Sequence, residues 1–465
     1  MESIDPGGAT MTVTTPDLRE RLATQAERHG VPGAALAVLR NGVVAEAATG
    51  VLNTRTGVAA TTDSVFQVGS ITKTWTATLI MQLVDEGLLD LDRPIRDHLP
   101  AFALADEAAA ALVTARHLLT HTAGFAGEDL TDYGRDDGAV AALVAGLAGA
   151  TQVTEPGALF SYNNAGFVVL GRLAEVLRGD AWSRVARRWL VGPLGLGTVV
   201  TLPEQALLHR TAVGHVEGGG RLTPAPVWSL PRALDPAGGL AMSAGDLLEF
   251  ARLHLRRGLA RDDTRLLSRA SAEAMRTHQS APPPLSAFPG SYGLGMDLDH
   301  WDGGTVVGHA GATIGQKAYL RMVPDADVAV ALLTNGGGSD GLYADLVLPL
   351  LAELAGVRAP EPVTPPAAGP PADPHRYVGD FDMGLATIRI GHDGRGPLTM
   401  TVIPRAAAIE ALVTNPVTAL AALDDVHFVE VEPDHGEHRD LIFLDPDADG
   451  RFRILHNSRA MPRIA

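Results

Sequence analysis

A proline-rich segment divides this chain into two parts. Residues 356–374 read GVRAPEPVTPPAAGPPADP and contain seven prolines, with neither a helical nor a strand period. Proline fixes φ and cannot donate a backbone hydrogen bond, so a run of this kind is typical of a stiff linker. We therefore predict a first domain over residues 1–356, a linker over 357–374 and a second domain over 375–465.

The two parts differ in their patterns. With 465 residues and 46% hydrophobic content, the chain is long enough to bury a full core and to form more than one domain. Beyond the linker, alternating runs such as Ala386–Ile390, Leu398–Val402 and Phe452–Leu455 are separated by Gly- and Asp-rich turns. Alternation with period two is typical of antiparallel strands, so we expect a small antiparallel β-domain after the linker.

Lysine is almost absent from the chain. Of the 37 basic residues only Lys73 and Lys317 are lysines, and all the others are arginines. A guanidinium stays protonated, whereas a desolvated ammonium can shift toward neutrality and then take a proton from a hydroxyl. Ser70 precedes Lys73 by three residues, which places the pair on one face at the start of a helix predicted over Thr74–Glu86.

That position suits a nucleophile. In the first turn of a helix, free backbone N–H groups and the positive end of the dipole favour a developing oxyanion next to Ser70. A serine cap followed by a solvated lysine would give the same four-residue pattern, so the assignment depends on the other motifs.

A second motif is Tyr162-Asn163-Asn164. It follows the Pro156-Gly157 turn and precedes a helix predicted over Ala165–Arg178, so Tyr162 lies on a loop that can point into a cleft. Beside a lysine ammonium, a tyrosine can be held as phenolate or share a proton with the lysine, and so act as general base and general acid. Asn164 can donate an amide N–H to a substrate carbonyl. The alternative is an Asx-rich helix cap.

A third motif is His309-Ala310-Gly311, before a run of β-type residues. Glycine at this place lets the backbone of a ligand approach the strand closely. The N–H group of Ala312 would complete an oxyanion hole with that of Ser70. A single histidine on a strand is more often an ordinary polar residue. His309 is a candidate site residue because its motif follows the other two in the chain.

Together, S-x-x-K, Y-x-N and H-x-G resemble the serine β-lactamase and penicillin-binding-protein superfamily. Further segments resemble signatures of its class C and esterase-like branch, and the resemblance runs from about Leu18 to Gly356; these segments are residues 118–124 (LLTHTAG), 237–247 (AGGLAMSAGDL) and 292–295 (YGLG). The resemblance implies an α/β (α+β) fold, with an antiparallel sheet covered by helices and an all-α lobe inserted between Ser70 and about Gly238. A lipocalin-like β-barrel domain would follow.

One departure narrows the function. The third motif of class C β-lactamases is K-T-G, and H-A-G here resembles that of related esterases, D-amino-acid-specific peptidases and peptide-cyclising thioesterases. With no class A glutamate motif after the second element, Tyr162 and Lys73 must supply the base. Size, linker and β-domain resemble the penicillin-binding-protein-type thioesterases, stand-alone cytoplasmic enzymes that release and cyclise nonribosomal peptides. A carboxylesterase or D-aminopeptidase is the alternative, and a silent binding protein is disfavoured by the three intact motifs.

The resemblance also implies roles for single residues. Ser70 would attack the donor carbonyl, and Lys73 and Tyr162 would move the proton. His309 would be the fourth catalytic residue and would position the substrate together with Asn164. The N–H groups of Ser70 and Ala312 would hold the oxyanion, and Arg459 in the barrel domain would reach the substrate or the catalytic lobe. The remaining substrate-binding residues would be Gly239 and Gly311. The expected partners are a small-molecule or peptidyl-thioester substrate and a carrier protein of a nonribosomal synthetase, and no cofactor is implied.

Composition excludes other classes. A formal charge of −17 without a basic stripe argues against nucleic-acid binding. The absence of cysteine excludes disulfides, a thiol nucleophile and a thiolate metal site. The first residues lack a basic region and an apolar core, and the longest apolar stretch, Ala139–Ala150, is too short for a bilayer, so we expect a cytoplasmic enzyme and no membrane partner.

Three patterns imitate other sites. The sequence around Ser243 nearly matches a nucleophile elbow. With Asp246 three residues later, Ser243 is better explained as a helix cap. Asp445–Gly450 opens like a calcium loop, yet an Asp/Gly hairpin turn is expected because the twelfth position is His456. His117 and His121 have i,i+4 spacing without an H-E-x-x-H pattern, and we predict no metal.

Overall fold

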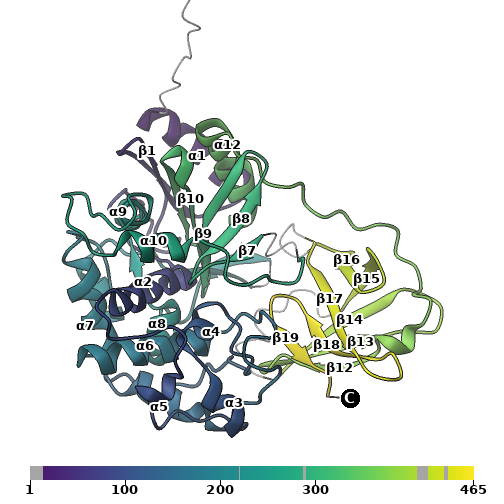
Figure 1. Ribbon diagram of the computed structural model, residues 1–465. Coiled ribbons are helices and arrows are strands. Elements are labelled where there is room, and N and C mark those ends of the chain that lie inside the picture. Colours follow the sequence, from purple (N-terminus) through teal and green to yellow (C-terminus); the bar gives the residue numbers. More distant parts are fainter. Residues whose placement is uncertain (1–13, 219, 286–289, 406–416, 434–437, 465) are drawn as a thin grey trace, which may run out of the picture.

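The computed structural model describes residues 14–218, 220–285, 290–405, 417–433 and 438–464. It contains a seven-stranded and an eight-stranded antiparallel sheet, with helices around the first (Figure 1). The predicted combination of a helix-covered antiparallel sheet with a C-terminal β-domain is confirmed.

The seven-stranded sheet has the order β2-β1-β11-β10-β9-β8-β7. Its strands are β1 (Gly33–Arg40), β2 (Val43–Gly50), β7 (Ser291–Tyr292), β8 (Asp297–Trp301), β9 (Gly304–Thr313), β10 (Gln316–Val323) and β11 (Val328–Thr334). In the centre, β1 and β11 are almost entirely buried, because both faces of the sheet are covered.

Alternate side chains of β1 enter two different cores. Leu36 and Val38 pack with helices α1 (Thr15–Arg28) and α12 (Leu348–Ala355) on one face. The neighbouring residues Ala35, Ala37 and Leu39 belong to a larger core on the other face, with helices α2 (Thr72–Asp85), α6 (Asn164–Arg178) and α9 (Ala244–Leu255). The second core includes Ile71 and Trp75, the neighbours of Ser70 and Lys73 in the chain.

Among the described residues between Ser70 and Gly238, the regular elements are helices joined by irregular stretches, together with one antiparallel strand pair, β4 (His215–Gly218) and β5 (Arg221–Pro224). The helices are α2 (Thr72–Asp85), α3 (Glu107–Leu112), α4 (Ala115–Leu119), α5 (Ala139–Gly146), α6 (Asn164–Arg178), α7 (Trp182–Ala186) and α8 (Asp235–Gly238). The remaining elements of this domain are β3 (Phe66–Gln67), β6 (Ala241–Met242), α9 (Ala244–Leu255), α10 (Arg269–Met275) and α11 (Ser339–Leu342). Both predicted helices, now α2 and α6, are present, and each begins one or two residues earlier than expected.

The second sheet runs in chain order from β12 to β19 and closes almost completely, because Phe381 in the first strand pairs with Arg463 after the last. Its strands are β12 (Gly379–Asp382), β13 (Ala386–Gly391), β14 (Leu398–Pro404), β15 (Val417–Ala422), β16 (His427–Glu430), β17 (Asp440–Pro446), β18 (Phe452–His456) and β19 (Ala460–Pro462). An aromatic cluster that includes Tyr377, Phe428 and Phe443 fills the barrel.

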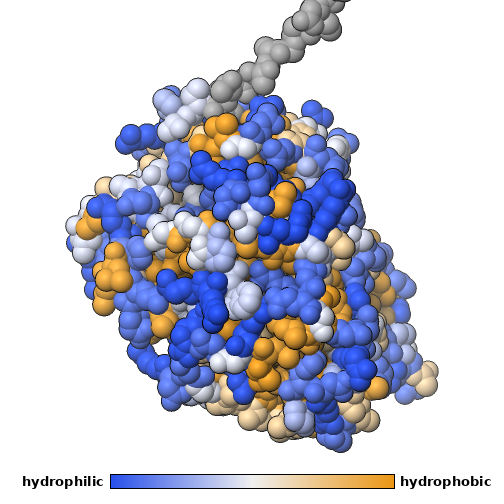
Figure 2. Space-filling model, turned by 60° about the vertical axis from the view of Figure 1, so that its left-hand side comes forward, coloured by the Kyte–Doolittle hydropathy of each residue, from blue (hydrophilic) through white to orange (hydrophobic). Residues whose placement is uncertain are grey.

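Residues 359–373 connect the two sheets without helix or strand and are mostly exposed. In Figure 1 this stretch leaves α12, runs along the outside and enters the barrel, which lies against the helical lobe. On the face drawn in Figure 2, apolar residues form separate patches among hydrophilic ones.

Across the described ranges, no helix combines the length and the apolar character that crossing a bilayer requires.

Candidate active site

Ser70 lies in a short 3-10 turn, Gly69–Ile71, that leads directly into α2. Strand β9 presses against this turn. A side chain on Gly311 would overlap the backbone just before Ser70, and a Cβ on Gly69, whose φ is 51°, would lie 2.7 Å from the backbone nitrogen of Ala312. The two glycines therefore bring the backbones of Ser70 and Ala312, the predicted oxyanion pair, close together.

Lys73 is completely buried one helical turn after Ser70. Its Nζ lies 3.0 Å from Ser70 Oγ, 2.7 Å from Asn164 Oδ1 and 2.9 Å from the carbonyl oxygen of Ala237. The Asn164 amide oxygen and the Ala237 carbonyl oxygen can only accept. When the amine is neutral, they take its two N–H bonds, and the lone pair of Nζ is left for the serine hydroxyl.

Burial lowers the pKa of Lys73 from 10.5 to about 7, with Glu128 and Asp297 opposing the shift and Arg459 adding to it. Near neutral pH a substantial fraction of the amine is therefore unprotonated. This is the state in which Lys73 can accept the proton of Ser70.

Tyr162 lies on the loop before α6, with its ring centroid 4.9 Å from Lys73 Nζ and a hydrogen bond to Ser70. Burial raises the pKa of the phenol above its usual value, although the bond to Ser70 opposes this shift. Of the two possibilities that the sequence allowed, a shared proton fits this environment and a resting phenolate does not. Tyr162 is therefore suited to pass on a proton, and Lys73 is the better acceptor.

Asn164 begins α6 and differs from the sequence expectation in its partners. Its Oδ1 accepts from Lys73, and its Nδ2 donates to both carboxylate oxygens of Glu128, at 3.1 and 3.2 Å. The amide N–H that we expected to point at substrate is used within the protein. Asn164 thus orients Lys73 in this structure.

His309 lies on β9 with its side chain buried and its ring 6.2 Å from that of Tyr162. Its Nδ1 lies 2.5 Å from the carbonyl oxygen of Ala310, which fixes an N–H at Nδ1. Burial lowers the pKa of His309 to about 3, and the Lys73 charge adds to the effect. His309 is therefore a neutral group, with Nε2 available as an acceptor.

The segment before Gly124 supports the tyrosine loop. The ring of His121 packs in a tilted arrangement against that of Tyr162, with 4.4 Å between centroids. Its carbonyl accepts from the N–H of Ser161, and its Nδ1 accepts from that of Asn163. Burial lowers the pKa of His121 well below its usual value, so the ring stays neutral. The LLTHTAG segment thus holds Tyr162 in place.

The barrel domain binds the other side of the same loop through the turn between β18 and β19. Arg459 in this turn lies with Nε 3.0 Å from Glu128 Oε1 and with its guanidinium 5.2 Å from the Tyr162 ring centroid. Backbone contacts reinforce the junction: His456 Nε2 lies 2.7 Å from the Phe160 carbonyl, the Tyr162 N–H donates to the Ser458 carbonyl at 2.8 Å, and the Ala460 N–H donates to the Ser161 hydroxyl at 3.0 Å.

Gly239 lies beside the group but contacts other atoms. It ends α8, where a Cβ would lie 2.6 Å from a carboxylate oxygen of Asp235, so the position requires glycine for packing. Within the described residues, the member of this segment that reaches Lys73 is Ala237, through its carbonyl oxygen.

Two carboxylates near the site escaped sequence reasoning. Glu128 lies in an irregular stretch without any motif, and only its contacts with Asn164 and Arg459 reveal it. Asp297 begins β8, and burial raises its pKa to about 6, with Arg321 and Lys73 opposing. A single acidic residue at a strand end carries no signal that would have identified it.

The three imitating patterns have structural explanations. Ser243 caps α9 by accepting from the Asp246 N–H at 3.2 Å, whereas the Asp246 carboxylate binds Thr198. In the turn between β17 and β18, Asp447 Oδ1 accepts two backbone N–H groups, as an Asp/Gly hairpin turn does.

His117 caps α4, and no group of three or more potential metal-ligating side chains occurs among the residues that the structure describes.

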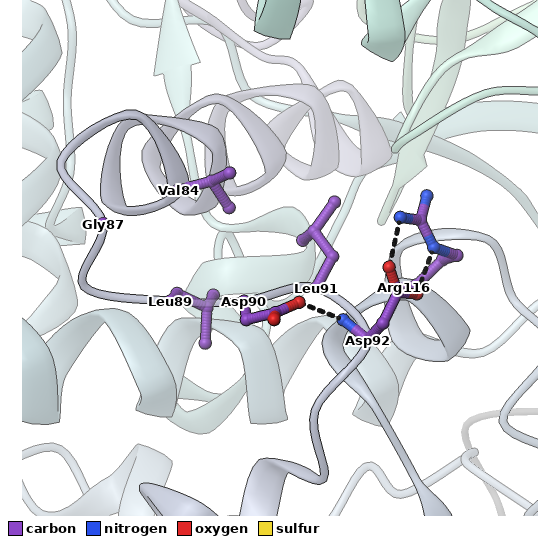
Figure 3. A pocket seen from close by; sticks show the side chains of 7 residues that line it. All are labelled: Val84, Gly87, Leu89, Asp90, Leu91, Asp92 and Arg116. Atoms are coloured by element: carbon purple, nitrogen blue, oxygen red, sulfur yellow. Dashed lines mark hydrogen bonds and ion pairs between the residues drawn. The ribbon is translucent and has the colours of Figure 1, made fainter.

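A separate pocket of about 340 Å³ lies at the end of α2 (Figure 3). None of the predicted site residues lines it; its lining is Val84, Gly87, Leu89, Asp90, Leu91, Asp92 and Arg116. Arg116 donates to both carboxylate oxygens of Asp92, at 2.6 and 2.8 Å, so its charge is compensated.

Comparison with known proteins agrees with the arrangement. The β-lactamase family profile matches residues 18–352. Penicillin-binding protein 4 of Amycolatopsis lactamdurans is 47% identical over 367 residues, which cover 78% of this chain and 96% of that protein. The unguisins hydrolase of Aspergillus campestris is 26% identical over 289 residues, covering 59% of this chain and 53% of that protein.

Among solved structures, SurE superimposes with a TM-score of 0.78 and 30% identity, covering 97% of this chain and 99% of that chain. A structure of SurE with D-Leu gives a TM-score of 0.77. The family match spans most of the chain, and the fold of SurE extends over both domains. The chain belongs to the β-lactamase and penicillin-binding-protein superfamily and is a serine hydrolase of the β-lactamase fold.

Proposed function

We propose that this protein is a stand-alone thioesterase that releases a nonribosomal peptide from its carrier and closes it into a ring through Ser70. The main support is the likeness to SurE, which covers 97% of the chain and so includes the barrel. A structure of SurE contains D-Leu, which supports a D-residue at the acyl end of the substrate. The H-A-G motif in place of K-T-G supports an acyl substrate other than a β-lactam.

Acylation would begin with attack of Ser70 Oγ on the thioester carbonyl. The serine proton passes to the neutral amine of Lys73, 3.0 Å away, as the C–O bond forms. The N–H groups of Ser70 and Ala312 would stabilise the oxyanion. Collapse of the tetrahedral intermediate breaks the C–S bond, and Tyr162 relays the proton to the leaving thiolate. The products are an acyl-Ser70 ester and the free carrier thiol.

Deacylation would use the amine at the other end of the peptide. The amine attacks the ester carbonyl and loses a proton to Lys73, and Ser70 leaves as a hydroxyl after taking that proton back. Tethering gives the amine a high effective concentration, and a site that excludes water favours it over hydrolysis. The products are a cyclic amide and the free enzyme.

The same proposal assigns the partner and the compartment. A peptidyl thioester of this kind is carried by a carrier protein of a nonribosomal synthetase, so we propose that such a carrier docks transiently near the site. The reaction then takes place in the cytoplasm, where the synthetase works.

A hydrolase without cyclase activity is the second candidate. Its supports are the 47% identity to a penicillin-binding protein and the likeness to a fungal hydrolase. In that reading water attacks acyl-Ser70, and the substrate is a simple ester or a peptide with a D-residue. Lys73 and Tyr162 keep the same roles.

One experiment separates the candidates. Linear peptidyl thioesters that end in a D-residue, in several lengths, are incubated with the full chain, and the products are separated by liquid chromatography with mass detection. A cyclase yields mainly product lighter than the linear acid by one water, and none with Ser70→Ala. Linear acid alone at every length, with faster turnover of p-nitrophenyl acetate, would establish the hydrolase instead.

A further inference from the structure

We propose that Glu128 is a positioning residue that couples the C-terminal barrel to the catalytic lysine. The assignment rests on the proposed roles of Ser70 and Lys73 in acylation, whichever substrate follows. A continuous chain of contacts carries it, from Arg459 through Glu128 and Asn164 to Lys73.

Glu128 determines which way the Asn164 amide faces. An amide has one end that accepts and one that donates, and a carboxylate can only accept. Both oxygens of Glu128 accept from Asn164 Nδ2, so Oδ1 must turn to Lys73, which it meets at 2.7 Å. Without an acceptor at Glu128 the amide would be free to rotate, and Lys73 would lose a fixed partner.

The barrel holds Glu128 from its own side. Arg459 donates to Oε1 at 3.0 Å, and a Cβ placed on Gly384, in the turn between β12 and β13, would lie 3.7 Å from the Cβ of Glu128. The side chain of Glu128 is 16% exposed, and that of Arg459 is 29% exposed. Two turns of the barrel therefore meet one residue of the catalytic domain, and Arg459 is the one that contacts its carboxylate.

The pair also balances charge near the amine. The negative charge of Glu128 favours the ammonium form of Lys73, and the positive charge of Arg459 opposes it. Loss of one member leaves the charge of the other uncompensated. The remaining titratable groups around the amine stay the same in every variant below: Tyr162, Asp297, His121 and His309.

The test measures the burst of p-nitrophenol from p-nitrophenyl acetate between pH 5 and 9, with full-length wild type, Glu128→Gln, Arg459→Met and the double variant. Because the base must be neutral, the burst rate rises through the pKa of Lys73. We expect the rise to move to lower pH in Glu128→Gln and to higher pH in Arg459→Met, each by about half a pH unit or more. The double variant should return close to wild type.

Matched controls use ion pairs away from the site. Glu107→Gln removes a partner of Arg96, and Arg453→Met removes a partner of Asp445 within the barrel, and neither should move the profile. Glu128→Asp and Arg459→Lys keep the charges and should keep the midpoint of the rise at its wild-type pH, even where the rate falls.

The outcomes are distinct. Shifts in the same direction, or none, in Glu128→Gln and Arg459→Met with unchanged melting temperatures would overturn the coupling. If Glu128→Gln and Arg459→Met fold poorly, the charge-conserving variants decide. A shifted midpoint of the pH profile in Glu128→Asp or Arg459→Lys would then overturn the coupling as well. A burst that persists in Ser70→Ala would instead refute the proposed nucleophile.

Discussion

The surroundings of the chain's two lysines differ in almost every respect. Lys73 on α2 is fully buried, and among the described residues its partners are a hydroxyl, an amide oxygen and a carbonyl oxygen, with no carboxylate in direct contact. Lys317 on β10 keeps 38% of its side chain exposed and pairs with the Asp340 carboxylate, which also accepts from the Tyr319 hydroxyl. One amine is kept from water without a counter-ion in contact, and the other is solvated and neutralised.

The contrast shows how a fold prepares an amine to act as a base. A carboxylate in contact would stabilise Lys73 as ammonium. The neutral dipolar acceptors bind the amine but do not compensate the desolvation of its charged form. The arginine-rich composition agrees with this contrast, because many arginines form ion pairs, for which a guanidinium is well suited.

Exchanging each lysine for arginine should give the largest difference. Lys73→Arg keeps the charge but removes the titratable amine, so acylation of Ser70 should fall by about two orders of magnitude or more. Lys317→Arg keeps its ion pair and should stay within a few-fold of wild type. Intact-protein mass spectrometry with a slowly deacylated thioester follows the adduct, and equal rates in both variants would remove Lys73 from catalysis.

The pH dependence of acylation should be set chiefly by Lys73. Burial lowers its pKa to about 7, so the rate should rise up to that pH and fall about tenfold for each unit below it, as the amine becomes protonated. In Lys317→Met the same curve is expected. Burst kinetics between pH 5 and 9 measure both, and a curve that is flat between pH 5 and 8 would contradict the assignment.

The barrel contact should matter most for large substrates. Arg459→Ala removes a charge-assisted hydrogen bond to Glu128, and we expect peptidyl thioester turnover to fall about tenfold while turnover of a small ester falls less. Arg453→Ala, on the same strand pair but away from the site, is the control. Equal losses on both substrates would indicate general destabilisation.

The smallest effects concern stability, and they should have opposite signs. Folding lowers the pKa of Lys73, so burying this amine reduces the stability of the folded protein at every pH below the pKa of the unfolded chain, which includes pH 7. Lys73→Met removes this destabilisation. Lys317→Met removes a partly exposed ion pair. We expect on the order of 1 kcal/mol gained in the first case and lost in the second, measured by urea unfolding at pH 7. A gain from both would break the comparison.

Local patterns predicted the parts of the site that local structure determines. The presence of α2 and α6 follows from helical periodicity, and Asn163 caps the start of α6, so both signals operate within a few residues. The antiparallel barrel followed from alternation and turn residues in the same way.

The rest depends on contacts between distant residues. Glu128 has no motif, and it becomes important only because α6 and the β18–β19 turn converge on it. The partner of Asn164 was expected to be substrate, since no pattern revealed this carboxylate. The protonation of Tyr162 follows from burial, and the contact made by Ala237 comes from a backbone carbonyl, which side-chain patterns do not encode.

The junction between Phe160–Tyr162 and the β18–β19 turn has a consequence for how the enzyme assembles and fails. The bond from His456 to Phe160 joins residues 296 positions apart, whereas Ser70 and Lys73 are three apart. Contacts of such range form late, because the chain must first close a long loop, and a docked interface opens before a core does. On heating, selectivity for long acyl chains should therefore disappear at a lower temperature than reactivity toward small esters, leaving an enzyme that still cleaves but no longer discriminates.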